Sequence, residues 1–217
     1  MTVTARSILL AALGAAALVS CSHGSSDVPS TTAAAISAGA SDPVAAFETV
    51  RTVLQDPRCQ NCHPPGDQPL QGEDGHFHTM NVQRGPDGHG APGARCATCH
   101  GTANPPPSYG PHQPPGVATD WHLPRPEMPL VFVGRSPEEL CEQLKDRSRN
   151  GGLDFAGLIK HVSTDPLVLW GWNPGYGRRP VAIPHADFVA AFTRWANAGG
   201  PCPPEGRKTA SVDASSR

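Results

Sequence analysis

Apolar side chains recur at helical spacing in separated stretches of the chain. The first covers residues 42–56 and opens on Asp42-Pro43, an N-cap followed by a proline at the first helical position. The last covers residues 185–197 and is followed by a Gly-Gly pair that favours helix termination. Their apolar faces are Phe47, Val50, Val53 and Leu54 in the first, and Phe188, Val189, Phe192 and Trp195 in the last. The pattern predicts two amphipathic helices.

Two further helices are expected between them. Ser136-Pro137-Glu138-Glu139 combines an N-cap, a first-turn proline and a capping-box glutamate, and predicts a helix that ends near residues 149–152. A shorter helix is expected over residues 153–162, and residues 167–175 are expected to form an aromatic loop.

Residues 64–129 show almost no apolar periodicity and are dominated by Pro, Gly and His. The whole chain contains 25 Pro and 23 Gly among 217 residues. A structureless stretch of this length is unusual in a compact domain unless a metal or cofactor orders it. We therefore expect a mostly α fold with extensive coil and little or no β-sheet, in which something other than side chains fills the centre.

The N-terminus has the pattern of an export signal. Arg6 precedes an apolar stretch over residues 8–19 that is too short to span a bilayer. The string Leu18-Val19-Ser20-Cys21 resembles a bacterial lipobox, which predicts a lipoprotein signal peptide over residues 1–20 and lipidation of Cys21. The alternative is an ordinary signal peptide with a chance cysteine.

The lipobox predicts that the chain is exported to the oxidising periplasm and anchored to a membrane by the lipid on Cys21. Neither Ser22 nor His23 is Asp, so by resemblance to lipoprotein sorting rules the outer membrane is expected. Residues 21–41 are rich in Ser, Ala, Thr and Gly and read as a flexible tether. Residues 204–217 are expected to be a disordered tail.

Two C-x-x-C-H strings carry the strongest chemical signal. They are Cys59-Gln60-Asn61-Cys62-His63 and Cys96-Ala97-Thr98-Cys99-His100. This string is typical of c-type haem attachment, in which the two thiols form thioethers with the haem vinyl groups and the histidine is the proximal iron ligand. The alternatives are a Cys₄ zinc site and a redox C-x-x-C pair. We expect two covalently bound haem c groups.

The other cysteines fit this allocation. Once Cys21 and the four haem cysteines are set aside, Cys141 and Cys202 remain, and an even remainder in an oxidising compartment predicts a disulfide. Two separate buried thiols are the alternative. Cys59 and Cys96 are too close in sequence for two complete tandem domains, so we expect one dihaem cytochrome c-like domain over residues 42–203.

Each iron needs a sixth ligand or stays open. His78 is the favoured candidate over the first haem, because alternation along an extended segment turns only one of His76 and His78 inward. His122 and Met128 are the candidates for the second haem. His89 is expected at the surface, and His161 and His185 are expected to have structural roles.

The charge balance excludes one class of partner. The chain has a formal net charge of −2, and removal of the signal peptide with Arg6 leaves 16 cations against 19 anions. Binding nucleic acid requires a basic face, so no nucleic-acid partner is expected.

Longer strings extend the signal beyond the haem motifs. The segments 78–88, 95–101, 121–124 and 167–179 resemble a family of exported dihaem c-type cytochromes that serve as the cytochrome-like subunit of isoquinoline 1-oxidoreductase-type molybdenum hydroxylases. The resemblance covers most of residues 45–203. It implies a redox partner protein, a molybdenum hydroxylase or another periplasmic dehydrogenase, from which electrons pass toward the respiratory chain.

The expected function is therefore electron transfer by a lipid-anchored dihaem cytochrome that catalyses no bond chemistry itself. A dihaem peroxidase with one open iron is the alternative, and it would need an acid/base residue such as His89 or Glu73 at that iron. A haem-based ligand sensor or assembly factor is a third hypothesis. The sequence shows no output module, which counts against this hypothesis.

Overall fold

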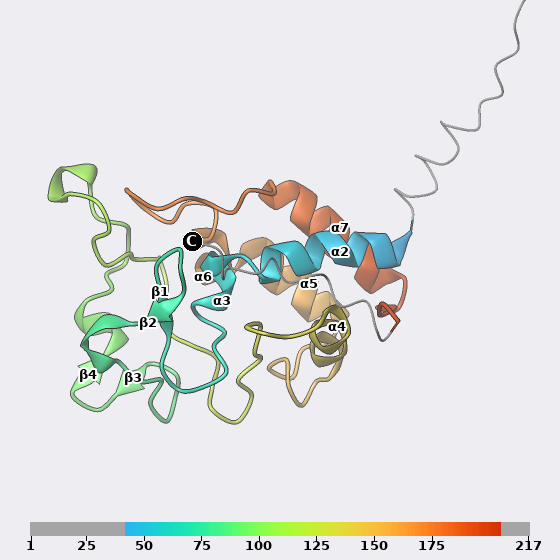
Figure 1. Ribbon diagram of the computed structural model, residues 1–217, viewed down its shortest axis with the longest axis horizontal. Helices are drawn as coiled ribbons and strands as arrows, with labels where there is room; N and C mark the ends of the chain where they lie inside the picture. The colour runs from blue at the N-terminus through green and yellow to red at the C-terminus, as the bar shows by residue number, and fades with distance from the viewer. Residues whose placement is uncertain (1–41, 205–217) are drawn as a thin grey trace, which may run out of the picture.

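The computed structural model describes residues 42–204 (Figure 1). The predicted signal peptide, the tether with Cys21 and all of the predicted tail except Pro204 lie outside the described residues. The α-helices are α2 (Pro43–Leu54), α3 (Pro57–Gln60), α4 (Pro137–Lys145), α5 (Phe155–Thr164), α6 (Pro166–Trp170) and α7 (His185–Asn197). The expectation of a mostly α fold is confirmed.

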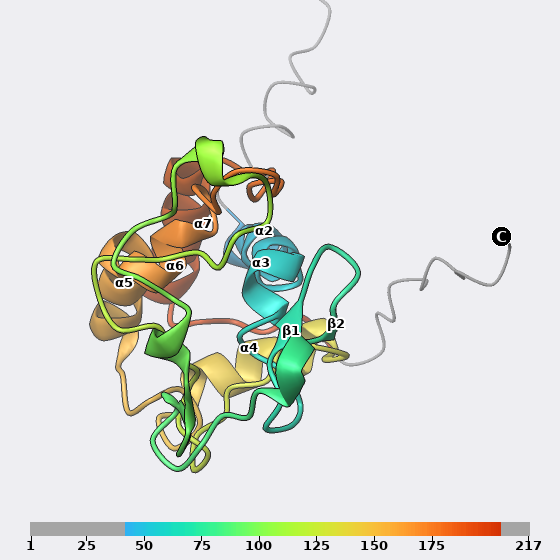
Figure 2. The same cartoon turned by 90° about the vertical axis from the view of Figure 1, so that its left-hand side faces the viewer.

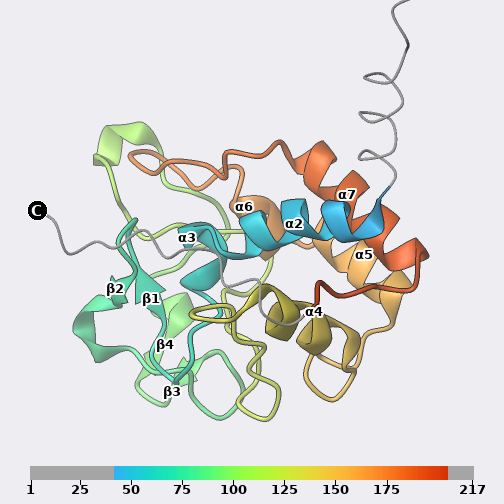
Figure 3. The same ribbon diagram turned by 45° about the vertical axis from the view of Figure 1, so that its right-hand side comes forward.

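The helices gather in one half of the molecule around an apolar core. Helix α2 lies between α7 and α4, and α5 packs against α7 (Figure 3). Phe47 of α2 and Trp195 of α7 are fully buried, with ring centroids 5.3 Å apart. The helical half therefore has a conventional side-chain core.

Local signals start most of the helices. The Asp42 carboxylate accepts a hydrogen bond from the Val44 amide at 2.9 Å and caps α2. The predicted capping box of α4 is present, with the Glu139 amide donating to Ser136 Oγ at 3.1 Å and the Ser136 amide donating to Glu139 Oε2 at 2.8 Å. Both helices begin at the predicted residue because an N-cap and a first-turn proline need no distant partner.

Two predicted boundaries are corrected. Helix α4 ends at Lys145, because the buried Asn150 side chain donates to the carbonyls of Leu144 and Leu153 and turns the chain back earlier than expected. The expected loop over residues 167–175 begins instead with the short helix α6. Asp165 caps α6 through the Leu167 amide at 2.9 Å, the same Asp-Pro signal that opens α2.

The other half of the molecule consists of loops, as expected. It contains two antiparallel hairpins, β1 (Leu70–Gln71) with β2 (His76–Phe77) and β3 (Gly90–Ala91) with β4 (Ala94–Arg95). Three 3₁₀ turns complete it: η1 (Thr79–Asn81), η2 (Cys96–Thr98) and η3 (Pro107–Tyr109). Figure 2 shows this half from the side of the hairpins.

One buried cation ties these loops together. The Arg84 side chain is 1% exposed. Its guanidinium donates to the carbonyls of Gly66 at 2.7 Å and Pro124 at 2.5 Å, and to the carboxylate of Asp67 at 3.2 Å. Arg84 therefore joins two loops that are about 60 residues apart in the sequence, by the strong hydrogen bonds typical of a charged donor.

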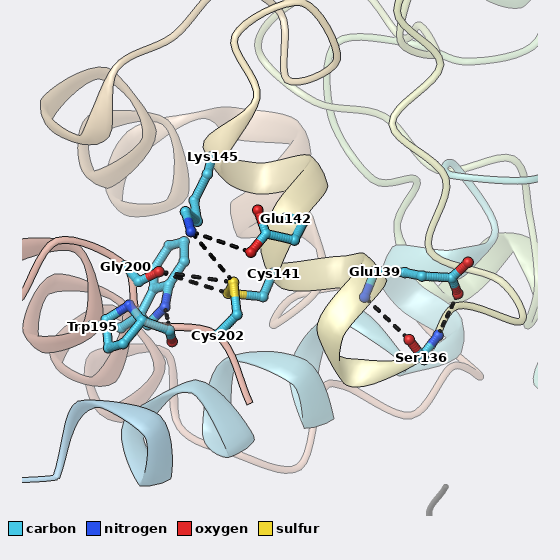
Figure 4. Close-up of a disulfide and its surroundings, with 9 residues drawn as sticks. Ser136, Glu139, Cys141, Glu142, Lys145, Trp195, Gly200 and Cys202 are labelled. Atoms are coloured by element: carbon cyan, nitrogen blue, oxygen red, sulfur yellow. Dashed lines mark hydrogen bonds and ion pairs between the residues drawn. A yellow bond between two sulfur atoms is a disulfide. The ribbon is translucent and has the colours of Figure 1, made fainter. Parts of the chain in front are cut away.

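The predicted disulfide between Cys141 and Cys202 is present, with a sulfur–sulfur distance of 2.09 Å (Figure 4). It joins buried Cys141 of α4 to the segment after α7 and spans 61 positions of sequence. The four haem-motif cysteines are not in disulfides. The predicted pairing of Cys141 with Cys202 is therefore confirmed.

None of the helices within residues 42–204 has the length and apolar character that crossing a membrane requires.

Candidate functional site

Both C-x-x-C-H motifs fold into a single helical turn. In the first, Asp56 caps α3 through the Arg58 amide, and the Cys62 amide donates to the Cys59 carbonyl at 3.2 Å. In the second, η2 begins at Cys96, and the amides of Cys99 and His100 both donate to the Cys96 carbonyl, at 3.1 and 3.0 Å. Each turn brings two thiols and an imidazole to the wall of one cavity.

The first motif lines a cavity of about 640 Å³, named cavity 1 here. The second motif lines cavity 2, of about 380 Å³. Both volumes lie within the range of about 300–1,000 Å³ that is usual for ligand and cofactor sites. The walls of cavity 1 come mainly from the helical half, including Val53, Leu144 and Phe192, whereas those of cavity 2 come mainly from the loops.

The two motif histidines have matching surroundings. His63 Nδ1 lies 2.8 Å from the Leu130 carbonyl oxygen, and Phe132 stacks on the ring with centroids 4.0 Å apart. His100 Nδ1 lies 2.8 Å from the Pro115 carbonyl oxygen, and Trp121 stacks on that ring at 4.3 Å. A backbone carbonyl that accepts from Nδ1–H orients the ring and leaves the Nε2 lone pair available to a metal.

Burial keeps both imidazoles neutral. Desolvation lowers the pKa of His63 to about 4 and that of His100 to about 4. A neutral imidazole is the form that ligates a metal, so both side chains are ready for this role at neutral pH.

The surroundings of the thiols argue against the two alternative readings of the motifs. Burial raises the pKa of Cys62 to about 11 and raises the pKa of Cys59 further, whereas a reactive redox thiol has a lowered pKa. Within residues 42–204, no three His, Cys, Asp or Glu side chains converge as they would around one ion. The four motif thiols therefore do not converge on one point within the described part of the chain.

Cavity 2 holds a second histidine that faces the motif histidine. The rings of His78 and His100 have centroids 6.2 Å apart. An imidazole nitrogen binds a metal at about 2 Å, and the ring centre lies about 1.2 Å behind it, so two imidazoles on opposite sides of one metal have centres about 6.4 Å apart. His78 Nδ1 lies 2.8 Å from the Thr79 carbonyl oxygen, which leaves its Nε2 free. The separation of the two rings would suit two histidines that hold one metal between them.

This position of His78 differs from the expected one over the first motif. The first hairpin, in which Leu70 pairs with Phe77, turns the chain back, and the His78 amide donates to the Pro69 carbonyl at 2.9 Å. The hairpin thereby carries His78 to the second motif. His76 stays exposed and pairs with Asp74 at 2.6 Å, so only one of the two histidines lines a cavity.

His122 and Met128, expected over the second haem, line cavity 1 instead. The Leu123 amide donates to the Gly88 carbonyl at 2.9 Å, which holds this segment against the loop after Arg84. Gly88 has a φ of +85°, and a Cβ there would collide with the Leu123 carbonyl oxygen, so the contact requires glycine. His89, expected at the surface, is half-buried and stacks on His122, with centroids 5.0 Å apart.

His161 also lines cavity 1, although the sequence indicated a structural role for it. It belongs to α5 and lines the same cavity as Cys59, Cys62 and His63 of the first motif. Its Nδ1 lies 3.3 Å from Asp165 Oδ2. A carboxylate on the far nitrogen is a common outer partner of metal-binding histidines. His185 keeps the expected structural role, with its Nε2 2.8 Å from the Val162 carbonyl oxygen.

The two cavities adjoin. Arg58, Cys62 and Leu123 line both of them. Cys96 of the second motif contributes to raising the pKa of Cys62 in the first. The attachment points of the two motifs are therefore neighbours in space although 34 residues separate these two cysteines in the sequence.

The sequence analysis did not identify Arg58, and it assigned Glu73 another role. Arg58, which precedes the first motif cysteine, is only 4% exposed, and no periodic pattern marks it. Glu73, an acid/base candidate in the peroxidase reading, instead forms an ion pair with Arg58 Nη2 at 2.7 Å. Glu73 lies outside the lining of both cavities, so it is not placed to serve as the acid/base residue that the peroxidase alternative would need.

Comparisons with protein-family models, with curated proteins and with solved structures return no match to this chain.

Proposed function

We propose that the protein is a dihaem c-type cytochrome that carries electrons. The observation that supports this best is that each C-x-x-C-H motif forms one wall of its own cavity, with both thiols free of disulfides and a neutral histidine whose Nε2 is unused. A haem bound in each cavity would supply a one-electron iron couple whose potential depends on its axial ligands and burial.

The residues for each site follow from the cavities. In cavity 1, Cys59 and Cys62 hold the porphyrin and His63 is the proximal ligand. His161 is the proposed distal ligand there, ahead of His122 and Met128, because it lines the same cavity as His63 and a carboxylate, that of Asp165, lies at its Nδ1. In cavity 2, Cys96 and Cys99 hold the porphyrin.

In cavity 2, His100 and His78 are the residues that would hold the iron of the second haem. Two histidines lower the potential relative to a His/Met pair. Because Cys62 lines both cavities, two haems held there would lie close enough to exchange electrons within the chain, which favours a carrier over a single-centre enzyme.

The peroxidase alternative has less support. It requires one open iron beside an acid/base group. Glu73 is committed to Arg58, and His89 is stacked on His122 beside other side chains that can ligate iron. Export, the lipid on Cys21, an outer-membrane location and a periplasmic dehydrogenase partner extend the proposal from the sequence alone.

Haem stoichiometry tests the proposal. The protein is produced in a bacterial host with working cytochrome c maturation, and haem per chain is measured by the pyridine haemochrome spectrum. We expect two haems in the parent and one each in the Cys59→Ala/Cys62→Ala and Cys96→Ala/Cys99→Ala variants. Cys141→Ala/Cys202→Ala is the matched control and should retain two.

A colourless product, or one that contains zinc in place of iron, would overturn the proposal. Two low-spin haems that are reversibly oxidised and reduced, without peroxide turnover, would support an electron carrier. A high-spin haem with peroxide-dependent turnover would support the peroxidase instead.

A further inference from the structure

Both motif histidines carry a flat aromatic side chain on one face. Trp121 lies almost parallel to His100, with 10° between the ring planes and 4.3 Å between the ring centroids. Phe132 lies on His63 in the same way, at 21° and 4.0 Å. Each imidazole is therefore contacted at its Nδ1 edge by a backbone carbonyl and on its face by an aromatic ring.

The carbonyl and the aromatic ring restrict different motions of the imidazole. His100 Nδ1 lies 2.8 Å from the Pro115 carbonyl oxygen, and this contact fixes one edge of the ring. A ring held at one edge can still turn about the line of its hydrogen bond. A flat contact on its face blocks that turn, so Trp121 is the residue that fixes the plane of His100.

Trp121 is itself held from two sides. The edge of the Trp170 ring meets it, with centroids 5.2 Å apart and 85° between the planes, which is a preferred arrangement of aromatic pairs. Trp170 is the last residue of α6 and is 8% exposed. Two residues after Trp121, the Leu123 amide donates to the Gly88 carbonyl at 2.9 Å. These contacts position the Trp121 ring against His100.

The plane of His100 matters because a second imidazole faces it. The ring planes of His78 and His100, which both line cavity 2, are inclined at 58° to each other. The π orbitals of an imidazole split the d orbitals of a bound low-spin ferric iron along a direction set by the ring plane. Two equal contributions combine as the cosine of the angle between the planes, so rings at 58° leave about half the splitting that parallel rings would give.

We infer that Trp121 is a positioning residue for the second haem: by fixing the plane of His100, it sets the angle between the two imidazoles that would hold that iron. The inference rests on the proposed function and deepens it, because it names a residue outside the ligand set that determines the electronic structure of one centre. Phe132 has the corresponding role at His63. Groups that orient a metal ligand tune the metal without touching it.

Low-temperature electron paramagnetic resonance of the oxidised two-haem protein tests the inference. The signal of the second haem is identified as the low-spin signal that His78→Ala removes. Trp121→Leu removes the flat ring, and it should replace the sharp feature at the largest g value of this signal with a broader one, because an unrestrained His100 takes several angles. Trp121→Phe keeps a flat ring and should keep the feature sharp. Neither variant should change the signal of the other haem.

Two further measurements separate this effect from a general disturbance of the fold. Phe132→Leu is the reciprocal variant and should broaden only the signal of the first haem. If Trp121→Leu fails to mature, Trp121→Met replaces it, since methionine fills irregular space without a flat face. The parent provides a test without any substitution: inclined planes give a larger maximum g value than parallel planes, so a second-haem signal of the parallel type would overturn the inference.

A sharp and unshifted feature in Trp121→Leu or Trp121→Met, even with a loss of stability, would show that Trp121 serves packing alone. That result would refute the inference and leave the proposed function standing. A parent protein without haem would refute the proposed function itself.

Discussion

Removing the Cys141–Cys202 disulfide should destabilise the domain by several kcal/mol. The bond closes a loop that spans 61 positions, from α4 to the segment after α7. The loss of loop-closure entropy for such a loop is worth about 4 kcal/mol at 25 °C. Because Cys141 is fully buried, alanine is a better replacement for it than serine. A serine hydroxyl at this position would need a new hydrogen-bond partner.

The double variant Cys141→Ala/Cys202→Ala is compared with the parent by guanidinium unfolding, followed through the far-ultraviolet circular dichroism of the oxidised protein. We expect the free energy of unfolding to fall by about 4 kcal/mol and the melting temperature to fall by about 10 °C. The denaturant slope should rise, because the unfolded chain without the cross-link is less compact and exposes more surface.

The haem spectrum of the same variant is the internal control. It should keep two haems, because neither cysteine lies in a C-x-x-C-H motif. A loss of stability below about 1 kcal/mol would refute the loop-entropy reasoning. A loss of haem would refute the division of the cysteines into structural and cofactor-binding pairs.

Three further predictions concern the loops and cavities. His78→Ala should convert one haem from low-spin to high-spin, as seen by low-temperature electron paramagnetic resonance, and added imidazole should restore the low-spin signal; two unchanged low-spin haems would exclude His78 as a ligand. His161→Ala should convert the other haem from low-spin to high-spin, whereas His122→Ala should leave both haems low-spin. A high-spin haem in His122→Ala but not in His161→Ala would assign the ligand to His122. Arg84→Ala removes hydrogen bonds to two backbone carbonyls and should lower the free energy of unfolding by about 2–3 kcal/mol in denaturant titrations. Arg84→Lys should recover only part of this loss. An effect below about 0.5 kcal/mol would show that the loops hold together without this cation.

The helices could be predicted closely because their signals are local. Asp42-Pro43 and Ser136-Pro137 set helix starts through contacts within a few residues. The missed helix α6 carries the same Asp-Pro signal, which the aromatic residues after it obscured. The end of α4 was missed because the Asn150 side chain, five residues beyond the last helical residue, turns the chain there.

The proposed chemistry of the site also rests on local signals. Two thiols and a histidine within five residues are sufficient to propose the attachment points and the proximal ligands, and one helical turn brings these residues together. The disulfide could be predicted by counting cysteines, which needs no geometry. These parts of the protein were determined by the sequence on its own.

Only the tertiary structure decided which distal side chain lies with which motif. A hairpin carries His78 to the second motif, and the contact of Gly88 with Leu123 places His122 in the first cavity, the reverse of the expected pairing. The same is true of Arg58, whose burial between the cavities depends on loops far along the chain. Segments without apolar periodicity are held in position by buried hydrogen bonds such as those of Arg84. These bonds join residues that are far apart in the sequence, and no sequence pattern indicates that they will meet.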